Sequence, residues 1–573
     1  MFCSWNDLSL LQYSMKLRSL AALLVFVLFT NPIAQATPII QSNAKAGFTI
    51  KAESYEATVG TDGYLNHLRI GEQEFLLPDI DISRGTYFHQ GGVVKMSKTT
   101  RTNAGTIDSE GPLASVRYAF TDNGMTWTVS NNSKAPMFFF AILPSSVSLG
   151  ADAKGRFVTM PSAQNWNESS WFSESSKLTF LTKGSARQWA WLQGSTVMEI
   201  NLAPGEKRVL ELTAGKVTDA DRAGMKAAGV DLGDLRISSP GELQVFQRTK
   251  RTEGPVKVAG KLFVSCDSVE VRFSGKDLNG KALKSEWQTV AYNSANSTFG
   301  SLYTLAAGGW YSAEFRAMKS NNEVATGKVA QFGVGEVFVG AGQSNSTNCG
   351  GGGSNLPTDG RIETKSGLVS SFDGKSWRIA NDPQLGTHDK SQGGSFWPAF
   401  GDAMTARYHV PIGVVVTGHG GTSINQWKSG SELFNWTLGR IKELEASAVP
   451  GYPSFRALLW HQGESDADMK GVAYANGLGT IIREMRQQSG RNFTWFIAKA
   501  SYRPGKPLEA PVTQGQKELW DKRVALAGPD TDAMLGELRD HGGKGIHFSK
   551  VGLKVHGEAW AEKVAPWLDQ QIK

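Results

Sequence analysis

The most constraining feature of this chain is a change of pattern after Gly335, where apolar runs begin to alternate with helical stretches. Each apolar run is short and continuous, as in a strand that is buried on both faces. The strand-like runs are Val337–Ala341, Ile412–Thr417, Ala457–Trp460 and Thr494–Ala498. The helical stretches are Trp397–Tyr408, Leu433–Ala446, Tyr474–Gln488, Gly515–Ala527 and Lys550–Trp567. This order predicts a parallel sheet flanked by helices on both faces.

The part of the chain before this region predicts β structure in two blocks. A length of 573 residues is too great for one hydrophobic core, so several domains are expected. Residues 38–216 alternate apolar and polar positions in short runs, which indicates a β-rich, sandwich-like domain. Residues 217–235 are predicted to be a linker with a short helical stretch. Residues 236–333 have the length and turn spacing of an immunoglobulin-like β-sandwich, and residues 334–573 form the predicted α/β domain.

The N-terminus has the order of features found in a secretory signal peptide. After Met15, two cations precede the apolar run Leu20–Phe29, which is followed by Ala34 and Ala36 around a single glutamine. The apolar run is too short to cross a bilayer, which needs about 20 residues. We therefore expect residues 1–36 to be a signal peptide, with Met15 as the true start. The mature protein is expected to be periplasmic or extracellular, with no membrane span.

Charge and cysteine content bear on nucleic-acid binding and on disulfide formation. The formal net charge is +7, and no dense run of Lys and Arg marks a nucleic-acid surface, so no nucleic-acid partner is expected. Cys266 and Cys349 are the cysteines that would remain after cleavage of the signal peptide. They lie in different predicted domains, which disfavours a disulfide between them.

Ligands of parallel α/β sheets bind outside the carboxyl ends of the strands, so the loops there are the place to look for a site. The first such loop carries Ser344, directly after the run Val337–Ala341. A serine in this position is by default a helix N-cap, and the alternative is a nucleophile. No Lys-Ser or Lys-Thr pair follows the glycines Gly350–Gly353, which excludes a P-loop.

Three further loops carry candidate active-site residues. The glycines of Gly418–Ile424 could form a turn, or they could let backbone N–H groups approach a substrate oxygen. The segment His461–Asp466 follows a buried strand-like run, and its many polar side chains need partners there. The segment Gly545–Ser549 contains His547 just before the last predicted helix. Together the four loops predict one active site.

The ordered set of these four segments resembles the SGNH hydrolases, in the branch of sialate O-acetylesterases and carbohydrate esterase family six. The resemblance covers roughly residues 334–573. The matching blocks are Gly342-Gln343-Ser344-Asn345, Gly420-Gly421-Thr422-Ser423-Ile424, His461-Gln462-Gly463-Glu464-Ser465-Asp466 and Gly545-Ile546-His547-Phe548-Ser549. The resemblance implies a serine esterase that removes O-acetyl groups from carbohydrate through an acetyl-serine intermediate, and with the predicted signal peptide this enzyme is expected to be secreted.

The resemblance also implies roles for residues. Ser344 would be the nucleophile and His547 the base that takes its proton. The backbone N–H groups of Ser344 and Gly421 and the side-chain amide of Gln462 would hold the developing oxyanion. No metal or other cofactor is expected, and His419 and His461 lack the spacing of metal ligands.

One position departs from the family pattern. Many members have an Asp three residues before the base, where this chain has Lys544. A lysine cannot accept a hydrogen bond from an imidazole, so the acid must come from elsewhere, or the enzyme works with a dyad. Glu464 is the first candidate for the acid, and Asp540, seven residues before His547, is the second. A structural salt bridge is the alternative role for Glu464.

The sequence leaves two alternatives open for the substrate contacts and two for the function. Trp397, Trp427 and Trp460 lie near these loops, and tryptophan either stacks on sugars or packs in a core. Asn345 and Trp427 are predicted to contact substrate. The alternative function is a carbohydrate-binding protein on a hydrolase scaffold with weak or no turnover.

Overall fold

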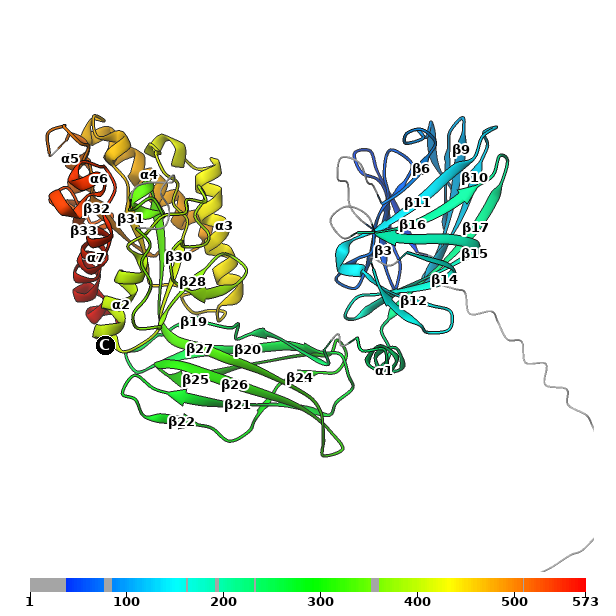
Figure 1. The fold of residues 1–573 in the computed structure, drawn as a ribbon, viewed down its shortest axis with the longest axis horizontal. Coiled ribbons are helices and arrows are strands. Elements are labelled where there is room, and N and C mark those ends of the chain that lie inside the picture. The colour runs from blue at the N-terminus through cyan, green and yellow to red at the C-terminus, as the bar shows by residue number, and fades with distance from the viewer. Residues whose placement is uncertain are drawn as a thin grey trace, which may run out of the picture. The chain divides into compact units, whose positions relative to one another are not determined.

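The computed structural model describes residues 38–572, apart from residues 77–84, 161–162, 191–194, 231–232, 352–359 and 509. The predicted signal peptide lies outside the described residues. The described residues form two compact units, divided between residues 231 and 232 (Figure 1).

The first unit is built from antiparallel strands around one core. Its strands are β1 (Ile39–Asn43), β2 (Gly47–Lys51), β3 (Glu56–Val59), β4 (Leu65–Ile70), β5 (Gln73–Glu74), β6 (Thr86–His89), β7 (Lys98–Asn103), β8 (Thr106–Glu110), β9 (Ala114–Thr121), β10 (Gly124–Asn131), β11 (Met137–Leu143), β12 (Leu149–Asp152), β13 (Phe157–Thr159), β14 (Gln164–Phe172), β15 (Ser176–Ala190), β16 (Thr196–Leu202) and β17 (Lys207–Lys216). Strands β1 to β5 form one sheet in chain order, and the others form a larger sheet. In β9, for example, Val116, Tyr118 and Phe120 are buried while their neighbours are not, which is the period of two expected of a half-buried strand.

The predicted linker, residues 217–235, contains helix α1 (Asp219–Ala227). Thr218 caps this helix, because its side chain accepts a hydrogen bond from the Asp221 backbone and the Asp221 side chain accepts one in return. The last residue of the predicted linker, Leu235, already begins strand β18.

A β-sandwich of two sheets opens the second unit. Its strands are β18 (Leu235–Ser239), β19 (Gln244–Gln247), β20 (Glu253–Leu262), β21 (Ser268–Lys276), β22 (Ala282–Lys284), β23 (Gln288–Val290), β24 (Tyr292–Asn293), β25 (Thr298–Ala306), β26 (Gly308–Lys319) and β27 (Asn322–Gly342). One sheet has the order β18-β20-β25-β24, and the other contains β22, β21, β26 and β27. The predicted boundary between residues 333 and 334 falls inside β27, which pairs with β26 in the sandwich and continues into the next sheet. The two parts of this unit therefore share a strand, where the sequence pattern predicted a boundary.

The rest of the second unit has parallel strands between helices. Strand β27 pairs in parallel with β30 (Ile412–Val416) on one side and with β31 (Ala457–His461) on the other. Strand β28 (Val369–Phe372) extends the sheet next to β30, with β29 (Trp377–Ile379) as an antiparallel edge. Strands β32 (Thr494–Lys499) and β33 (Leu526–Asp530) extend it in parallel beyond β31.

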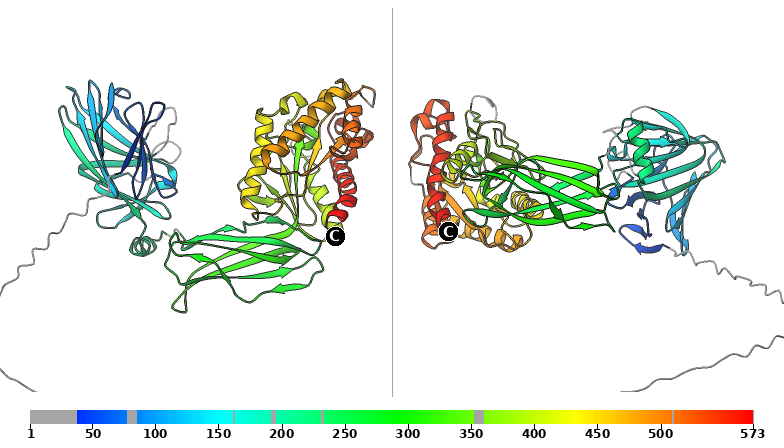
Figure 2. Two further views of the ribbon diagram at one scale, coloured as in Figure 1. Left: turned by 180° about the vertical axis from the view of Figure 1, so that it is seen from behind. Right: turned by 90° about the horizontal axis from the view of Figure 1, so that it is seen from below.

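Helices cover both faces of this parallel sheet. They are α2 (Trp397–Tyr408), α3 (Glu432–Ser447), α4 (Gly471–Ser489), α5 (Val512–Asp521), the short α6 (Asp540–Gly543) and α7 (Lys550–Gln571). Alternate residues of the strands enter two different cores, one with α2 and α7 and one with α3, α4 and α5. Figures 1 and 2 show α2 and α7 together on one side of the strands and α3 on the other.

One predicted helix is wrong in extent. The helix predicted for Gly515–Ala527 begins at Val512 and ends at Asp521, and Leu526 begins the edge strand β33. Arg523 has a φ of 56°, a left-handed conformation that stops a helix, so the chain turns before Ala527. The strands β28, β29 and β33 are absent from the strand-like runs predicted from sequence.

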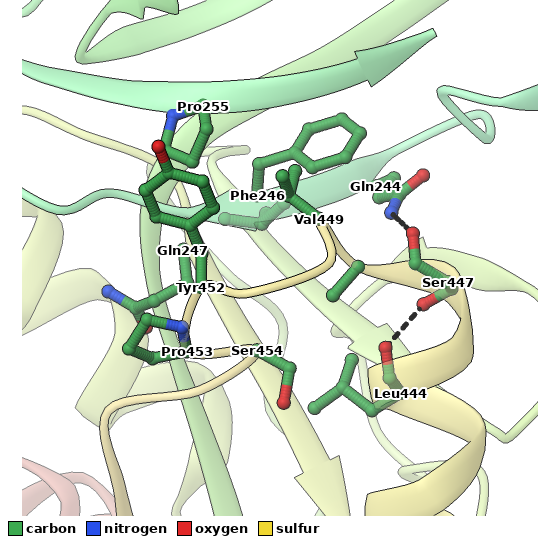
Figure 3. Close-up of a pocket in the computed structure, with 12 residues that line it drawn as sticks. Gln244, Phe246, Gln247, Pro255, Leu444, Ser447, Val449, Tyr452, Pro453 and Ser454 are labelled. Carbon is green, nitrogen blue, oxygen red and sulfur yellow. Dashed lines mark hydrogen bonds between the residues drawn. The ribbon is translucent and has the colours of Figure 1, made fainter. Parts of the chain in front are cut away.

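Charged and polar side chains join the sandwich to the α/β part. Glu336 of β27 is fully buried, and its carboxylate accepts hydrogen bonds from Gln247, Arg248 and Arg456 at 2.7–2.8 Å. Beside this junction lies a hollow of only about 10 Å³, where Gln244 donates to the Ser447 carbonyl at 3.1 Å (Figure 3). None of its lining residues belongs to the four predicted active-site loops.

Candidate active site

The strand order brings three of the four predicted loops together. Because β27 lies between β30 and β31 in parallel, the loops after these strands leave the same edge of the sheet. The contact between the first and third loops is close, since the Gln343 backbone donates to the His461 carbonyl at 2.8 Å. Gly342 is required at this approach, because its φ is 126° and a Cβ there would lie 2.1 Å from the His461 oxygen.

Ser344 begins a short 3-10 turn, Ser344–Ser346, directly after β27. Its exposed fraction is 6%, so little of the residue reaches the surface. The turn is fixed from within, because the Ser346 backbone and side chain both donate to the Gln343 carbonyl. Within the described residues, neither the Ser344 hydroxyl nor its backbone N–H has a hydrogen-bond partner, so both are available to a substrate.

The nucleophile loop is tied directly to the loop that carries His547. The Asn345 amide donates to the Ile546 carbonyl at 3.3 Å, so the residue after Ser344 contacts the residue before His547. Asn345 is 5% exposed, and the same amide nitrogen donates to Glu464 at 2.7 Å. Asn345 therefore holds loops together, and the prediction that it contacts substrate has no support from these contacts.

A tight loop places Asp540 beside His547. His541, Gly542 and Gly543 all have positive φ values, between 50° and 86°, which turn the chain back on itself. The Asp540 backbone then donates to the His547 carbonyl at 3.0 Å. As a result, the Asp540 carboxylate lies 3.7 Å from His547 Nδ1, and it lies at the same distance from His541 Nε2.

The Asp540 carboxylate is buried without firm partners. Its side chain is 2% exposed, while that of His547 is 21% exposed. In the described part of the chain, neither carboxylate oxygen has a hydrogen bond. A distance of 3.7 Å is too long for a hydrogen bond, but such contacts in empty sites often tighten when substrate binds.

Glu464, the first candidate for the acid from sequence, faces away from this arrangement. Its Oε1 accepts hydrogen bonds from His461 Nε2 at 3.0 Å and from Asn345 at 2.7 Å. Among the described residues, the acidic groups within 4.0 Å of His547 are limited to Asp540. The geometry thus does not support Glu464 as the partner of His547; it supports the structural salt bridge for Glu464 and brings Asp540 to the base.

The electrostatics around Glu464 are those of a buried ion pair. Burial alone raises the pKa of Glu464, but the charge of His461 and the hydrogen bonds from His461 and Asn345 outweigh it and lower the pKa to about 2. Behind this pair, His461 Nδ1 lies 3.2 Å from His556 Nε2. Burial, with the nearby charges of His461 and Arg539, lowers the pKa of His556 well below its ordinary value, so His556 is neutral.

The glycine loop after β30 approaches the nucleophile. A Cβ added to Gly420 would lie 3.5 Å from the Ser344 Cβ, so the two backbones are neighbours. Gly421 follows with a φ of 70°, and a Cβ added there would meet nothing within 4 Å. Within the described residues the Gly421 N–H has no hydrogen-bond acceptor, so it is free to donate to a substrate.

Gln462 is not placed as an oxyanion donor. Its side chain is fully buried, and its amide nitrogen donates to Asp466 at 2.7 Å and to the Thr422 carbonyl at 3.0 Å. Tyr474 donates to its carbonyl oxygen at 2.9 Å. Because both amide hydrogens are engaged inside the protein, Gln462 supports the glycine loop from behind.

The tryptophans predicted near the site belong to the core. Trp427 is 1% exposed, donates to the Thr422 hydroxyl at 3.0 Å and packs edge to face on Trp460 at 5.1 Å. Trp397 is also buried and donates to the Ser346 carbonyl. The structure therefore gives no support to the prediction that Trp427 contacts substrate, because its ring has no accessible face.

The described residues contain no cluster of metal ligands and no disulfide. No group of three or more His, Cys, Asp or Glu side chains there has the arrangement of a metal site. Cys266 and Cys349 are both free thiols. None of the helices in the described ranges combines the length and apolar character that a membrane span requires.

Two residues that sequence reasoning missed contact the loops of the site. Arg539 is 2% exposed and donates to the carbonyls of Met534, Thr531 and Ile546, while its guanidinium lies between two aromatic rings. Asp389 accepts a hydrogen bond from the Gly420 N–H at 2.8 Å. No motif marks either residue, and their partners are mostly backbone groups that a sequence pattern does not reveal.

Comparisons with known proteins identify the C-terminal segment. Residues 334–565 match the family described as "Carbohydrate esterase, sialic acid-specific acetylesterase". A probable carbohydrate esterase of Arabidopsis thaliana is 32% identical over 93 residues, which are 15% of this chain and only 34% of that relative. The chain thus matches about a third of the length of this curated relative.

Solved structures show weaker likenesses. A carbohydrate acetylesterase from Xanthomonas citri is 16% identical with a TM-score of 0.34, over 57% of this chain and 73% of the other. The X-ray structure of an Arabidopsis thaliana protein is 19% identical with a TM-score of 0.33, over 40% of this chain and 98% of the other. The family match spans all four predicted loops, so residues 334–565 are similar to the carbohydrate esterases that this family describes.

Proposed function

We propose that this protein is a serine esterase that removes O-acetyl groups from carbohydrate, with Ser344 as nucleophile, His547 as base and Asp540 as the acid that orients the base. The observation that carries the proposal is the junction of the two loops, in which Asn345 donates to Ile546 and Asp540 lies 3.7 Å from His547 Nδ1. The family of residues 334–565 supports ester hydrolysis on carbohydrate.

In the first half of the reaction, the Ser344 hydroxyl attacks the acetyl carbonyl while His547 Nε2 takes its proton. The Asp540 carboxylate, 3.7 Å from Nδ1, then stabilises the positive charge of the His547 imidazole. His547 next donates the proton to the departing sugar oxygen, which leaves as a free hydroxyl. The product on the enzyme is an acetyl ester of Ser344.

In the second half, His547 removes a proton from water, which attacks the acetyl-serine. His547 then returns this proton to Ser344 Oγ as the acyl–oxygen bond breaks and acetate leaves. In both halves negative charge develops on the carbonyl oxygen. The backbone N–H groups of Ser344 and Gly421 have no acceptors among the described residues, and they are our proposed oxyanion donors. Gln462 is left out of this role because its amide is engaged with Asp466 and Thr422.

The proposal also includes export of the protein from the cytoplasm. The charged, apolar and small-residue order of residues 15–36 supports cleavage of a signal peptide and an extracytoplasmic place of action. An exported esterase would meet acetylated glycans outside the cytoplasm. N-terminal sequencing of the protein recovered from the periplasm or medium tests this, and an uncleaved N-terminus would contradict it.

The test of the activity is acetate release. We expect the purified protein to hydrolyse p-nitrophenyl acetate and to release acetate from an acetylated polysaccharide. Ser344→Ala should lower the rate by at least about 1,000-fold with an unchanged melting temperature. An unchanged rate in this variant would overturn the proposal, and glycan binding by the wild type without acetate release would favour a carbohydrate-binding protein without turnover.

A further inference from the structure

Two consecutive residues, His388 and Asp389, contact three consecutive residues of the glycine loop after β30. The His388 backbone donates to the Gly418 carbonyl at 3.0 Å, and its ring Nδ1 lies 2.7 Å from that of His419. The Asp389 Oδ2 accepts the Gly420 N–H at 2.8 Å. The glycine loop is therefore held along its length by one short segment from elsewhere in the chain.

The same carboxylate also faces the nucleophile loop. Asp389 Oδ1 accepts hydrogen bonds from the Ser391 backbone at 3.0 Å and from its hydroxyl at 2.7 Å. Ser391 in turn accepts hydrogen bonds from Asn348, which lies four residues after Ser344: its hydroxyl accepts the Asn348 N–H at 3.1 Å and its carbonyl accepts the Asn348 amide at 3.0 Å. Asp389 thus connects the loop of Gly420 to the loop of Ser344.

This connection decides which backbone N–H groups remain for a substrate. The Gly420 N–H is used by Asp389, although Gly420 is the glycine whose Cβ position lies 3.5 Å from Ser344. The next N–H, that of Gly421, has no acceptor within the described residues. Only the φ and ψ angles of Gly420 separate its N–H from that of Gly421, so holding the Gly420 peptide restricts the directions open to the Gly421 N–H.

We propose that Asp389 is a positioning residue that sets the oxyanion donors of the esterase, by holding Gly420 so that the Gly421 N–H faces the carbonyl attacked by Ser344. This rests on the proposed function of Ser344. A carboxylate suits the position because it accepts from Gly420 and Ser391 at once and carries no hydrogen of its own. An oxyanion donor that is out of place lowers the rate of the chemical step and leaves substrate binding nearly unchanged.

The test compares Asp389→Ala and Asp389→Asn with a matched control, Asp402→Asn. Asp402 lies on α2, is partly buried like Asp389 and accepts hydrogen bonds from Thr364, Lys365 and Ser366, away from the glycine loop. The readouts are kcat and KM for p-nitrophenyl acetate and the melting temperature. Wild type and Ser344→Ala are measured beside them, so that a failure of the proposed function is recognised separately.

We expect Asp389→Ala to lower kcat by at least about 10-fold, toward the 100-fold loss typical of a missing oxyanion donor, with KM within about twofold of wild type. Asp389→Asn keeps one acceptor oxygen and should show a smaller loss of the same kind, and it decides the question if Asp389→Ala does not fold. The proposal is overturned if wild type is active, Ser344→Ala is inactive, and the folded Asp389 variants have the same kcat as Asp402→Asn.

Discussion

Two buried carboxylates near Ser344 have opposite surroundings. Glu464 and Asp540 are 3% and 4% exposed. Glu464 accepts two hydrogen bonds through one oxygen and forms an ion pair with His461, and its pKa falls to about 2. The Asp540 carboxylate has no hydrogen bond among the described residues, and its neighbours are two histidine nitrogens at 3.7 Å.

The difference separates a structural acid from a candidate catalytic one. A buried carboxylate with firm partners stabilises the loops that it joins, as Glu464 does through His461 and Asn345. A buried carboxylate without them destabilises the fold, and such strain persists mainly at functional sites. Asp540, next to the partly exposed His547, fits the second description.

The largest expected effect is on catalysis through Asp540. Asp540→Asn should lower kcat for p-nitrophenyl acetate by roughly 1,000- to 10,000-fold, because the amide cannot stabilise the charged imidazole. Its melting temperature should stay level or rise, since a buried charge without hydrogen bonds is removed. Lys544→Ala is the control on the same loop: Lys544 is exposed, and we expect activity within about twofold of wild type. An Asp540→Asn enzyme with wild-type kcat would remove Asp540 from the site.

The second prediction concerns Glu464, whose substitution should affect stability more than activity. Glu464→Gln should lower the free energy of unfolding by roughly 3 kcal/mol, because His461 loses its buried partner. We expect kcat to fall by only about 10-fold, through movement of Asn345 and its contact with Ile546. Urea unfolding and steady-state kinetics on one preparation measure both. A loss of kcat as large as that of Asp540→Asn, without loss of stability, would restore Glu464 as the acid.

A third effect concerns pH. The pKa of Glu464 is lowered from 4.5 to about 2 in the folded protein, so its contribution to stability is complete above pH 4.5 and is lost as the pH falls toward 2. The free energy of unfolding of the wild type should therefore fall more steeply between about pH 5 and about pH 3 than that of Glu464→Gln. Parallel curves for the two proteins would show that the ion pair with His461 does not form.

The smallest effect is expected at a tryptophan outside both carboxylate networks. Trp427→Phe removes the hydrogen bond to Thr422 but keeps most of the buried ring, so about 1–2 kcal/mol of stability should be lost. Activity should stay within about twofold, because Trp427 has no accessible face for a sugar. A selective rise in KM for an acetylated polysaccharide, with p-nitrophenyl acetate unaffected, would show that Trp427 reaches substrate after all.

Sequence alone was a good guide to the elements and the loops. Apolar runs predict the strands around Ser344 because these strands are buried on both faces, and the helix predicted at Trp397–Tyr408 has the same bounds in the structure. The short strands β28, β29 and β33 were missed, since three to five residues at or next to a sheet edge have too little periodicity to be distinguished from a loop.

The direction of each side chain within the loops was harder to predict. Gln462 and Glu464 lie in the correct loop, but one turns under the glycine loop and the other toward His461. The return of Asp540 to His547 depends on three successive positive φ values, which the Gly542-Gly543 pair indicates only in part. Asp389 acts on backbone N–H groups, and no residue pattern records such contacts.

The most direct test of the account is to look for acetyl-Ser344. The protein is mixed rapidly with p-nitrophenyl acetate, quenched in acid, digested and analysed by peptide mass spectrometry, with Ser344→Ala as the control. We expect one acetyl group on the peptide that contains Ser344 in the wild type, and none on the matching peptide of the variant. Continued acetate release with no acetyl group on Ser344, or with the group on another residue, would contradict the account.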